Sequence, residues 1–127
     1  MIRVEDASVP VAVAMVSDLI FGSRIIAEGK SAGMEVRTIA SPAALSAIMA
    51  EEEVRLVLVD MTAGRQAACE AIASAARHAG APAIVAFYPH VDAELREAAA
   101  AAGAGIVLPR SRFVQELPDI LRRCLAE

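Results

Sequence analysis

The sequence alternates five short apolar runs with longer alanine-rich blocks, and this alternation is the strongest constraint on how it folds. The runs are bounded by Gly, Pro, Ser or Asp, as is typical of strands. Several are continuously apolar, which is expected of parallel strands that helices cover on both faces. The predicted strands are Val11–Val16, Met34–Ile39, Arg55–Val59, Ala83–Phe87 and Ile106–Leu108.

The blocks between these runs are predicted to be helices, because apolar residues recur in them at helical spacing. Ser41 followed by Pro42 is typical of an N-cap and a first helical residue. Glycines at 33, 80 and 103 are placed to end helices. The predicted helices are Leu19–Ala32, Pro42–Glu52, Arg65–Ala79, Asp92–Ala102 and a last one with Ser111 near its start, in which Pro118 is compatible with a fresh first turn.

Strand and helix thus alternate five times, which predicts an α/β fold with a parallel sheet covered by helices on both faces. Five strands in this length fit a flavodoxin-like, doubly wound (βα)5 arrangement with a parallel five-stranded sheet in the order 2-1-3-4-5. The 127 residues are expected to form one domain over residues 1–127, with residues 1–9 as an N-terminal segment.

Composition and charge exclude several classes of function. A net charge of −4 and the lack of a basic run argue against nucleic acid and anionic membrane as partners. No export signal or membrane span is recognisable, so a cytoplasmic protein is expected. Cys69 and Cys124 lie outside any disulfide or zinc spacing, and are expected to be thiols in a reducing compartment.

Polar side chains follow four of the predicted strands, at the point where each strand ends. In doubly wound sheets, ligands bind outside the carboxyl ends of the strands, where the order of the strands reverses. Two carboxylates, a phenol, an imidazole and a guanidinium are therefore expected to converge on one edge of the sheet. They belong to Asp18, Asp60, Tyr88, His90 and Arg110.

This pattern resembles the receiver domain of two-component response regulators over nearly the whole chain. In that family an acidic pair ends strand one, an Asp ends strand three, a Thr or Ser ends strand four and a Lys ends strand five. Asp60, in the run Leu58-Val59-Asp60, matches the phosphoacceptor, and Asp18 matches the second acid of the pair.

The remaining positions depart from the family pattern. Ser17 stands where the first acid belongs, Phe87 and Tyr88 stand at the switch position, and Arg110 replaces the Lys. Fewer carboxylates hold Mg²⁺ more weakly, and Arg does not reproduce the point charge of Lys. The chain therefore resembles an atypical, degenerate receiver.

The resemblance implies a stand-alone signalling protein, not an enzyme, whose output passes through protein contacts. Asp60 is the implied site of phosphorylation by a histidine kinase. Mg²⁺ is implied as a weakly held cofactor, with Asp18, Asp60 and the backbone of Thr62 as its ligands. Arg110 would neutralise the phosphoryl group, Phe87, Tyr88 and His90 are the switch or sensor candidates, and a homodimer stays open.

Each of these residues also has a simpler interpretation. Asp18 suits the N-cap of the first helix, and Asp60 suits a turn. Arg110 suits a structural ion pair with Asp60 that closes an empty pocket, and His90 suits a solvated loop. Two further functions are open: a pseudo-receiver that never takes a phosphoryl group, and a small-molecule binding domain that uses Tyr88 and Arg110 in the same crevice.

Overall fold

Five parallel strands form one sheet in the order β2-β1-β3-β4-β5 in the computed structural model, which describes residues 9–126. This is the predicted flavodoxin-like order, in which the chain winds toward one edge of the sheet from β1 to β2 and toward the other edge from β3 to β5. The strands are β1 (Val11–Met15), β2 (Glu35–Ile39), β3 (Val54–Asp60), β4 (Ala83–Tyr88) and β5 (Ile106–Pro109).

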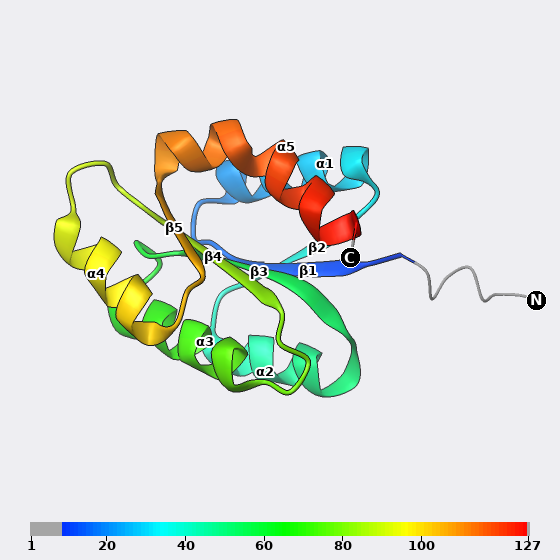
Figure 1. Ribbon diagram of the computed structural model, residues 1–127, viewed down its shortest axis with the longest axis horizontal. Coiled ribbons are helices and arrows are strands. Elements are labelled where there is room, and N and C mark those ends of the chain that lie inside the picture. The colour runs from blue at the N-terminus through cyan, green and yellow to red at the C-terminus, as the bar shows by residue number, and fades with distance from the viewer. Residues whose placement is uncertain (1–8, 127) are drawn as a thin grey trace, which may run out of the picture.

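Helices cover both faces of the sheet, as Figure 1 shows. On one face lie α1 (Leu19–Ala32) and α5 (Arg110–Ala126). On the other lie α2 (Pro42–Glu51), α3 (Arg65–Arg77) and α4 (Ala93–Ala102). No helix within residues 9–126 is long and apolar enough to cross a membrane.

The sheet divides the apolar interior into two clusters, because successive side chains of a strand point to opposite faces. On β1, Val13 and Met15 belong to the cluster under α2, α3 and α4, whereas Ala12 and Ala14 belong to the cluster under α1 and α5. Cys69 packs beside the first cluster and Cys124 lies within the second, and both are thiols.

Several predicted boundaries are wrong by one or two residues. Met34 precedes β2, because its N–H donates to the carbonyl of Gly29 at 2.8 Å and so closes the end of α1. Helix α3 ends at Arg77 rather than Ala79, and His78 follows it in an extended conformation. Tyr88 lies inside β4, where it pairs with Pro109 of β5.

The prediction for Pro118 is also wrong, because α5 continues through this residue without a fresh start. A proline inside a helix removes one backbone hydrogen bond and costs about 3 kcal/mol. In compensation, one face of α5 is buried along its whole length against the sheet. Its buried residues are Phe113, Leu117, Ile120, Leu121 and Cys124.

The C-terminal end of α5 is held by an arginine from the sheet. Arg55 of β3 donates from Nη1 to the carbonyl oxygen of Cys124 at 3.0 Å, and that of Leu125 lies at 3.4 Å. A cation at this end also balances the helix dipole. We expect Arg55→Met to lower the free energy of unfolding by about 1–2 kcal/mol in urea denaturation. Faster amide exchange should be confined to the last turn of α5, and uniform acceleration would contradict this.

Candidate functional site

Asp60 is the last residue of β3, and its side chain is held by the turn that follows. Its Oδ1 accepts hydrogen bonds from the backbone N–H of Thr62 at 2.9 Å and from the Thr62 hydroxyl at 2.6 Å. The backbone N–H of Ala63 closes the turn on the Asp60 carbonyl at 3.0 Å. Asp60 is only 3% exposed, and it is the one buried charged residue among those described.

Asp18 caps the first turn of α1. Its Oδ1 accepts from the backbone N–H groups of Ile20 at 2.9 Å and Phe21 at 3.1 Å, which otherwise have no helical partner. Of the two interpretations of Asp18, the N-cap is therefore confirmed. The Phe21 N–H is the main cause that lowers the pKa of this carboxyl, with a smaller contribution from Arg110 and with partial desolvation opposing it.

Arg110 pairs with Asp18 and not with Asp60, so the predicted Asp60–Arg110 ion pair is wrong. Arg110 is the first residue of α5, and its Nη2 lies 3.5 Å from Asp18 Oδ2. Its guanidinium carbon also lies 3.9 Å from the centre of the Phe21 ring, a distance at which cation–π attraction operates. Asp18, Arg110 and Phe21 thus tie the beginning of α5 to the beginning of α1.

Phe87 lies beneath this contact, in the core rather than at the surface. Its ring stacks on Phe113 of α5, with centroids 4.2 Å apart, and meets Phe21 edge-on at 5.5 Å. The ring is 1% exposed. In this structure Phe87 is a packing residue that joins β4, α1 and α5.

Tyr88 lies on the far side of the sheet from this arrangement, and His90 lies in the loop after β4. Tyr88 is 7% exposed and belongs to the cluster under α2, α3 and α4, so the sheet separates its ring from Phe87. His90 is exposed in the loop before α4. The described contacts of Arg110 are with Asp18 and Phe21 and include neither Tyr88 nor His90.

Sequence reasoning missed Phe21 and Phe113 as parts of the site. Both stand at helical spacings that indicate only a core face. Nothing in the sequence indicates that the Arg110 guanidinium packs on the Phe21 ring. The Thr62 hydroxyl was also missed, because only the backbone of Thr62 was expected to take part. The spacing Asp60-x-Thr62 directly after a strand is typical of a side chain that bonds to the backbone two residues on, and this signal was available.

The two carboxylates expected to hold Mg²⁺, those of Asp18 and Asp60, already make contacts within the protein. No three His, Cys, Asp or Glu side chains gather within the part of the chain that the structure describes. Oxygens of Asp18 are engaged by the α1 backbone and by Arg110, and Asp60 Oδ1 is engaged by Thr62. A metal ion that used these oxygens would have to displace these contacts.

Asp18 also lines a pocket of about 260 Å³ that opens toward β2. Its wall includes Leu19, Ser23 and Thr38, and it contains neither Tyr88 nor Arg110. The small-molecule crevice expected between Tyr88 and Arg110 therefore does not coincide with this pocket.

Comparison with known proteins supports the fold that the geometry indicates. No family model matches the chain, and no curated protein matches its sequence. Among solved structures, a response regulator from Thermotoga maritima superposes with a TM-score of 0.76 at 15% identity, over 94% of this chain and 99% of that one. The chain has the receiver-domain fold.

Two further receiver-fold structures give the same result. The chemotaxis response regulator CheY4 of Vibrio cholerae has a TM-score of 0.75 at 16% identity and covers 91% of this chain and 98% of its own. A LuxR family DNA-binding response regulator from Silicibacter pomeroyi has a TM-score of 0.69 at 22% identity, with 93% of both chains covered. At these identities the likeness establishes the receiver fold and leaves function to be argued from the site.

The cap at Asp18 gives this receiver fold a defined dependence on pH. The pKa of Asp18 is lower in the folded than in the unfolded protein, so the carboxylate stabilises the fold above about pH 4. This stabilisation is lost as the pH falls through the lowered, folded pKa. Asp18→Asn keeps an N-cap oxygen without the charge. We expect its free energy of unfolding to fall less than that of the wild type between pH 5 and pH 2; equal falls would contradict this role.

Proposed function

We propose that this chain is a receiver-fold signalling module that acts by binding other proteins and does not depend on phosphorylation of Asp60. The burial of Asp60 carries the proposal, since a phosphoacceptor must reach a phosphoryl donor. Both hydrogen bonds from Thr62 hold its carboxylate within its own turn. In this role Asp60 is a structural residue that shapes the end of β3.

The positions of Asp18 and Arg110 support the same conclusion. Phosphoryl transfer depends on charges that are free to neutralise the transferred group. Here the Arg110 guanidinium is taken up by the Phe21 ring and by Asp18, and Asp18 is taken up by the α1 backbone. These contacts favour a site whose charged groups are paired with one another and with the protein backbone.

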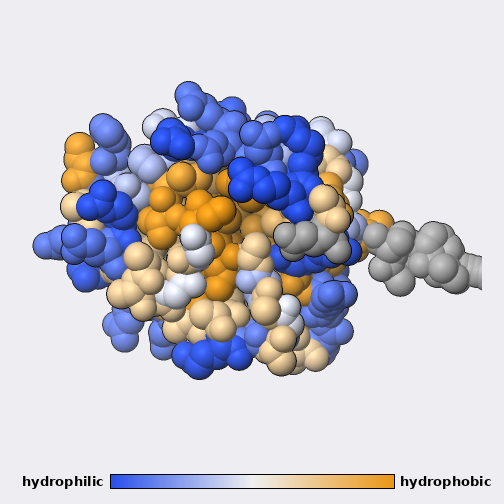
Figure 2. Space-filling view, viewed as in Figure 1, coloured by the Kyte–Doolittle hydropathy of each residue, from blue (hydrophilic) through white to orange (hydrophobic). Residues whose placement is uncertain are grey.

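The surface of α4, β5 and α5 is the proposed output face. All four residues of β5 are half-buried, and β5 is an edge strand of the sheet. Figure 2 shows apolar surface in this region, between α5 above and α4 below. We propose a protein as the partner and a role other than catalysis, in the cytoplasm, in line with the acidic charge and the two thiols. A second copy of the chain is included among the candidates for this face.

A second candidate function is phosphorylation of Asp60 by a histidine kinase. One observation favours it: Oδ2 of Asp60 accepts no hydrogen bond from any residue that the structure describes. In this case Asp60 would be the phosphoacceptor, with Mg²⁺ recruited by rearrangement around Asp18 and Thr62. Arg110 would have to leave Asp18 and Phe21 to approach the phosphoryl group.

Beryllofluoride, a mimic of the phosphoryl group, separates the two functions. The wild type, Asp60→Asn and Asp92→Asn are titrated with beryllofluoride and Mg²⁺, and bound fluoride is followed by ¹⁹F NMR. Asp92 is the matched control, because it caps α4 and is a half-buried carboxylate of the same type. We expect no bound signal in any of the three proteins. A signal in the wild type and in Asp92→Asn that is lost in Asp60→Asn would overturn the proposal and establish Asp60 as the phosphoacceptor.

A further inference from the structure

A groove made of two neighbouring pockets lies between α1 and the edge strand β2, away from the proposed output face. It consists of a pocket of about 450 Å³ near the start of β2 and the 260 Å³ pocket near its end, and Ile26 lines both. Of the five large hydrophobic side chains exposed in the described chain, three line this groove: Val9, Leu19 and Ile26. We call it the β2 groove. Its concentration of exposed apolar side chains indicates a binding surface.

Strand β2 brings backbone hydrogen-bonding groups to the same groove. It is an edge strand that pairs with β1 alone. The N–H of Glu35 donates to the carbonyl of Pro10 at 2.9 Å and so points toward β1. Because successive residues of a strand point their N–H and C=O groups to opposite sides, those of Val36 and Thr38 point outward. The side chains of these two residues also line the groove.

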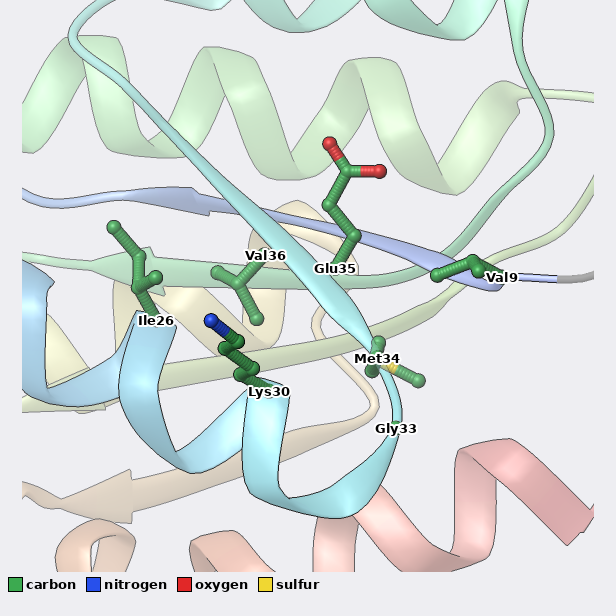
Figure 3. A pocket seen from close by; sticks show the side chains of 7 residues that line it. All are labelled: Val9, Ile26, Lys30, Gly33, Met34, Glu35 and Val36. Atoms are coloured by element: carbon green, nitrogen blue, oxygen red, sulfur yellow. The ribbon is translucent and has the colours of Figure 1, made fainter. Parts of the chain in front are cut away.

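The charges around the groove differ at its two walls. Figure 3 shows Ile26 and Lys30 of α1 pointing toward Val36, whereas Glu35 points to the opposite side of the strand. Lys30 is the only lysine in the sequence and forms no ion pair with any residue of the described chain. Glu35, in contrast, is paired with Arg37 at 2.9 Å. The groove therefore presents one uncompensated positive charge, at the end where β2 begins.

We propose that the β2 groove binds an extended segment of a partner protein as an added antiparallel strand, with apolar residues at alternate positions and a carboxylate at its C-terminal end. Backbone pairing with Val36 and Thr38 supplies the hydrogen bonds of the added strand. In an antiparallel pair, residues directly opposite each other share a face. The residues opposite Val36 and Thr38 therefore place their side chains in the groove, against Ile26.

The position of Lys30 sets the direction of the bound segment. Lys30 lies beside the beginning of β2, so a terminal carboxylate reaches it only when the segment runs opposite to β2. Side chains at the intervening positions face the other side of the sheet, where Arg37 is paired with Glu35 and Glu52. These positions are therefore polar. The predicted ligand alternates apolar and polar residues and ends in a free carboxylate.

The proposal is tested with a fluorescent peptide, Thr-Val-Thr-Val-Thr-Val, whose binding to the full chain is measured by fluorescence polarisation. The free acid is expected to bind about tenfold more tightly than the C-terminal amide. Lys30→Gln should remove this preference. Ile26→Asp should weaken binding of the free acid by about tenfold or more. Val91→Asp, at a hydrophobic residue that is 88% exposed in the loop before α4, is the matched control and should leave binding unchanged.

N-methylation of the peptide tests the backbone pairing without altering the protein. A methyl group on the nitrogen of a central valine removes a donor that faces β2, and it should abolish binding. The same group on the neighbouring threonine faces away and should have little effect. In the wild-type complex, the amide resonances of Val36 and Thr38 should shift most.

Three results would overturn the proposal. They are no binding at millimolar peptide, equal effects of the two N-methylated peptides, and loss of binding in Val91→Asp equal to that in Ile26→Asp. A dimer in sedimentation that Ile26→Asp disrupts would show that a second copy of the chain occupies the groove instead. These outcomes are independent of Asp60, so they do not bear on the beryllofluoride experiment.

Discussion

Replacing Phe113 by alanine is expected to lower the free energy of unfolding by about 3–5 kcal/mol. Phe113 is fully buried, stacks on Phe87 and lies 6.1 Å from the Phe21 ring, so its removal opens a cavity between α5 and the sheet. Urea denaturation followed by circular dichroism measures the change. Phe113→Leu, which keeps much of the volume, should cost clearly less.

The same substitution is expected to loosen the contact above the cavity. Phe21 supports the Arg110 guanidinium, and Phe113 supports Phe21 in turn. Phe113→Ala should therefore weaken the attachment of α5 to α1, seen as faster amide exchange in the first turns of both helices. If Phe113→Ala lowers the free energy of unfolding by less than about 1 kcal/mol, the three rings are not a structural unit.

Gly103→Ala is expected to lower the free energy of unfolding by about 3 kcal/mol, because it combines backbone strain with a steric clash. Gly103 ends α4 with φ at +121°, a region that side chains rarely adopt. An added Cβ would lie 2.9 Å from the Cβ of Ala76 on α3, so α4 would have to move away from α3. Chemical denaturation and thermal melting should both report the loss.

Gly33→Ala is the matched control for this substitution. Gly33 ends α1 with φ at +95°, but an added Cβ there meets nothing within 4 Å. It carries the backbone strain without the clash and should cost about 1–2 kcal/mol. If both variants lose the same stability, the close approach of α4 to α3 contributes nothing measurable.

The fold was predictable because its signals are repeated and local. Five apolar runs, each bounded by turn residues, determine five strands, and the strand–helix alternation determines a parallel sheet. The capping residues Asp18, Ser41 and Asp92 all lie at helix starts as their chemistry favours. The prediction of a fresh helical turn at Pro118 was wrong, because a helix continues through a proline only where the rest of it is well buried. The burial of α5 is a property of the folded molecule.

The candidate site was only partly predictable. Its location at the carboxyl ends of the strands follows from topology, and the ends of β1 and β3 place Asp18 and Asp60 there. The pairing of Arg110 does not follow from the sequence, because Asp18 and Asp60 both lie at that edge. The choice depends on Phe21, whose ring holds the guanidinium 3.9 Å from its centre and beside Asp18. The direction of the Arg110 side chain is therefore decided by packing in the folded protein.

The strand order has a consequence for how the molecule is assembled during synthesis. Strand β2 pairs with β1, and β3, β4 and β5 then each add beside a strand that has already left the ribosome. The sheet can therefore grow in the order of translation, without waiting for a later strand to be inserted between earlier ones. Helix α5 is different, because it follows all five strands in the sequence and covers apolar side chains of β1, β3 and β4. Until α5 has been synthesised, that face of the nascent sheet lacks one of its two covering helices, and its exposed apolar side chains make this the stage most prone to aggregation.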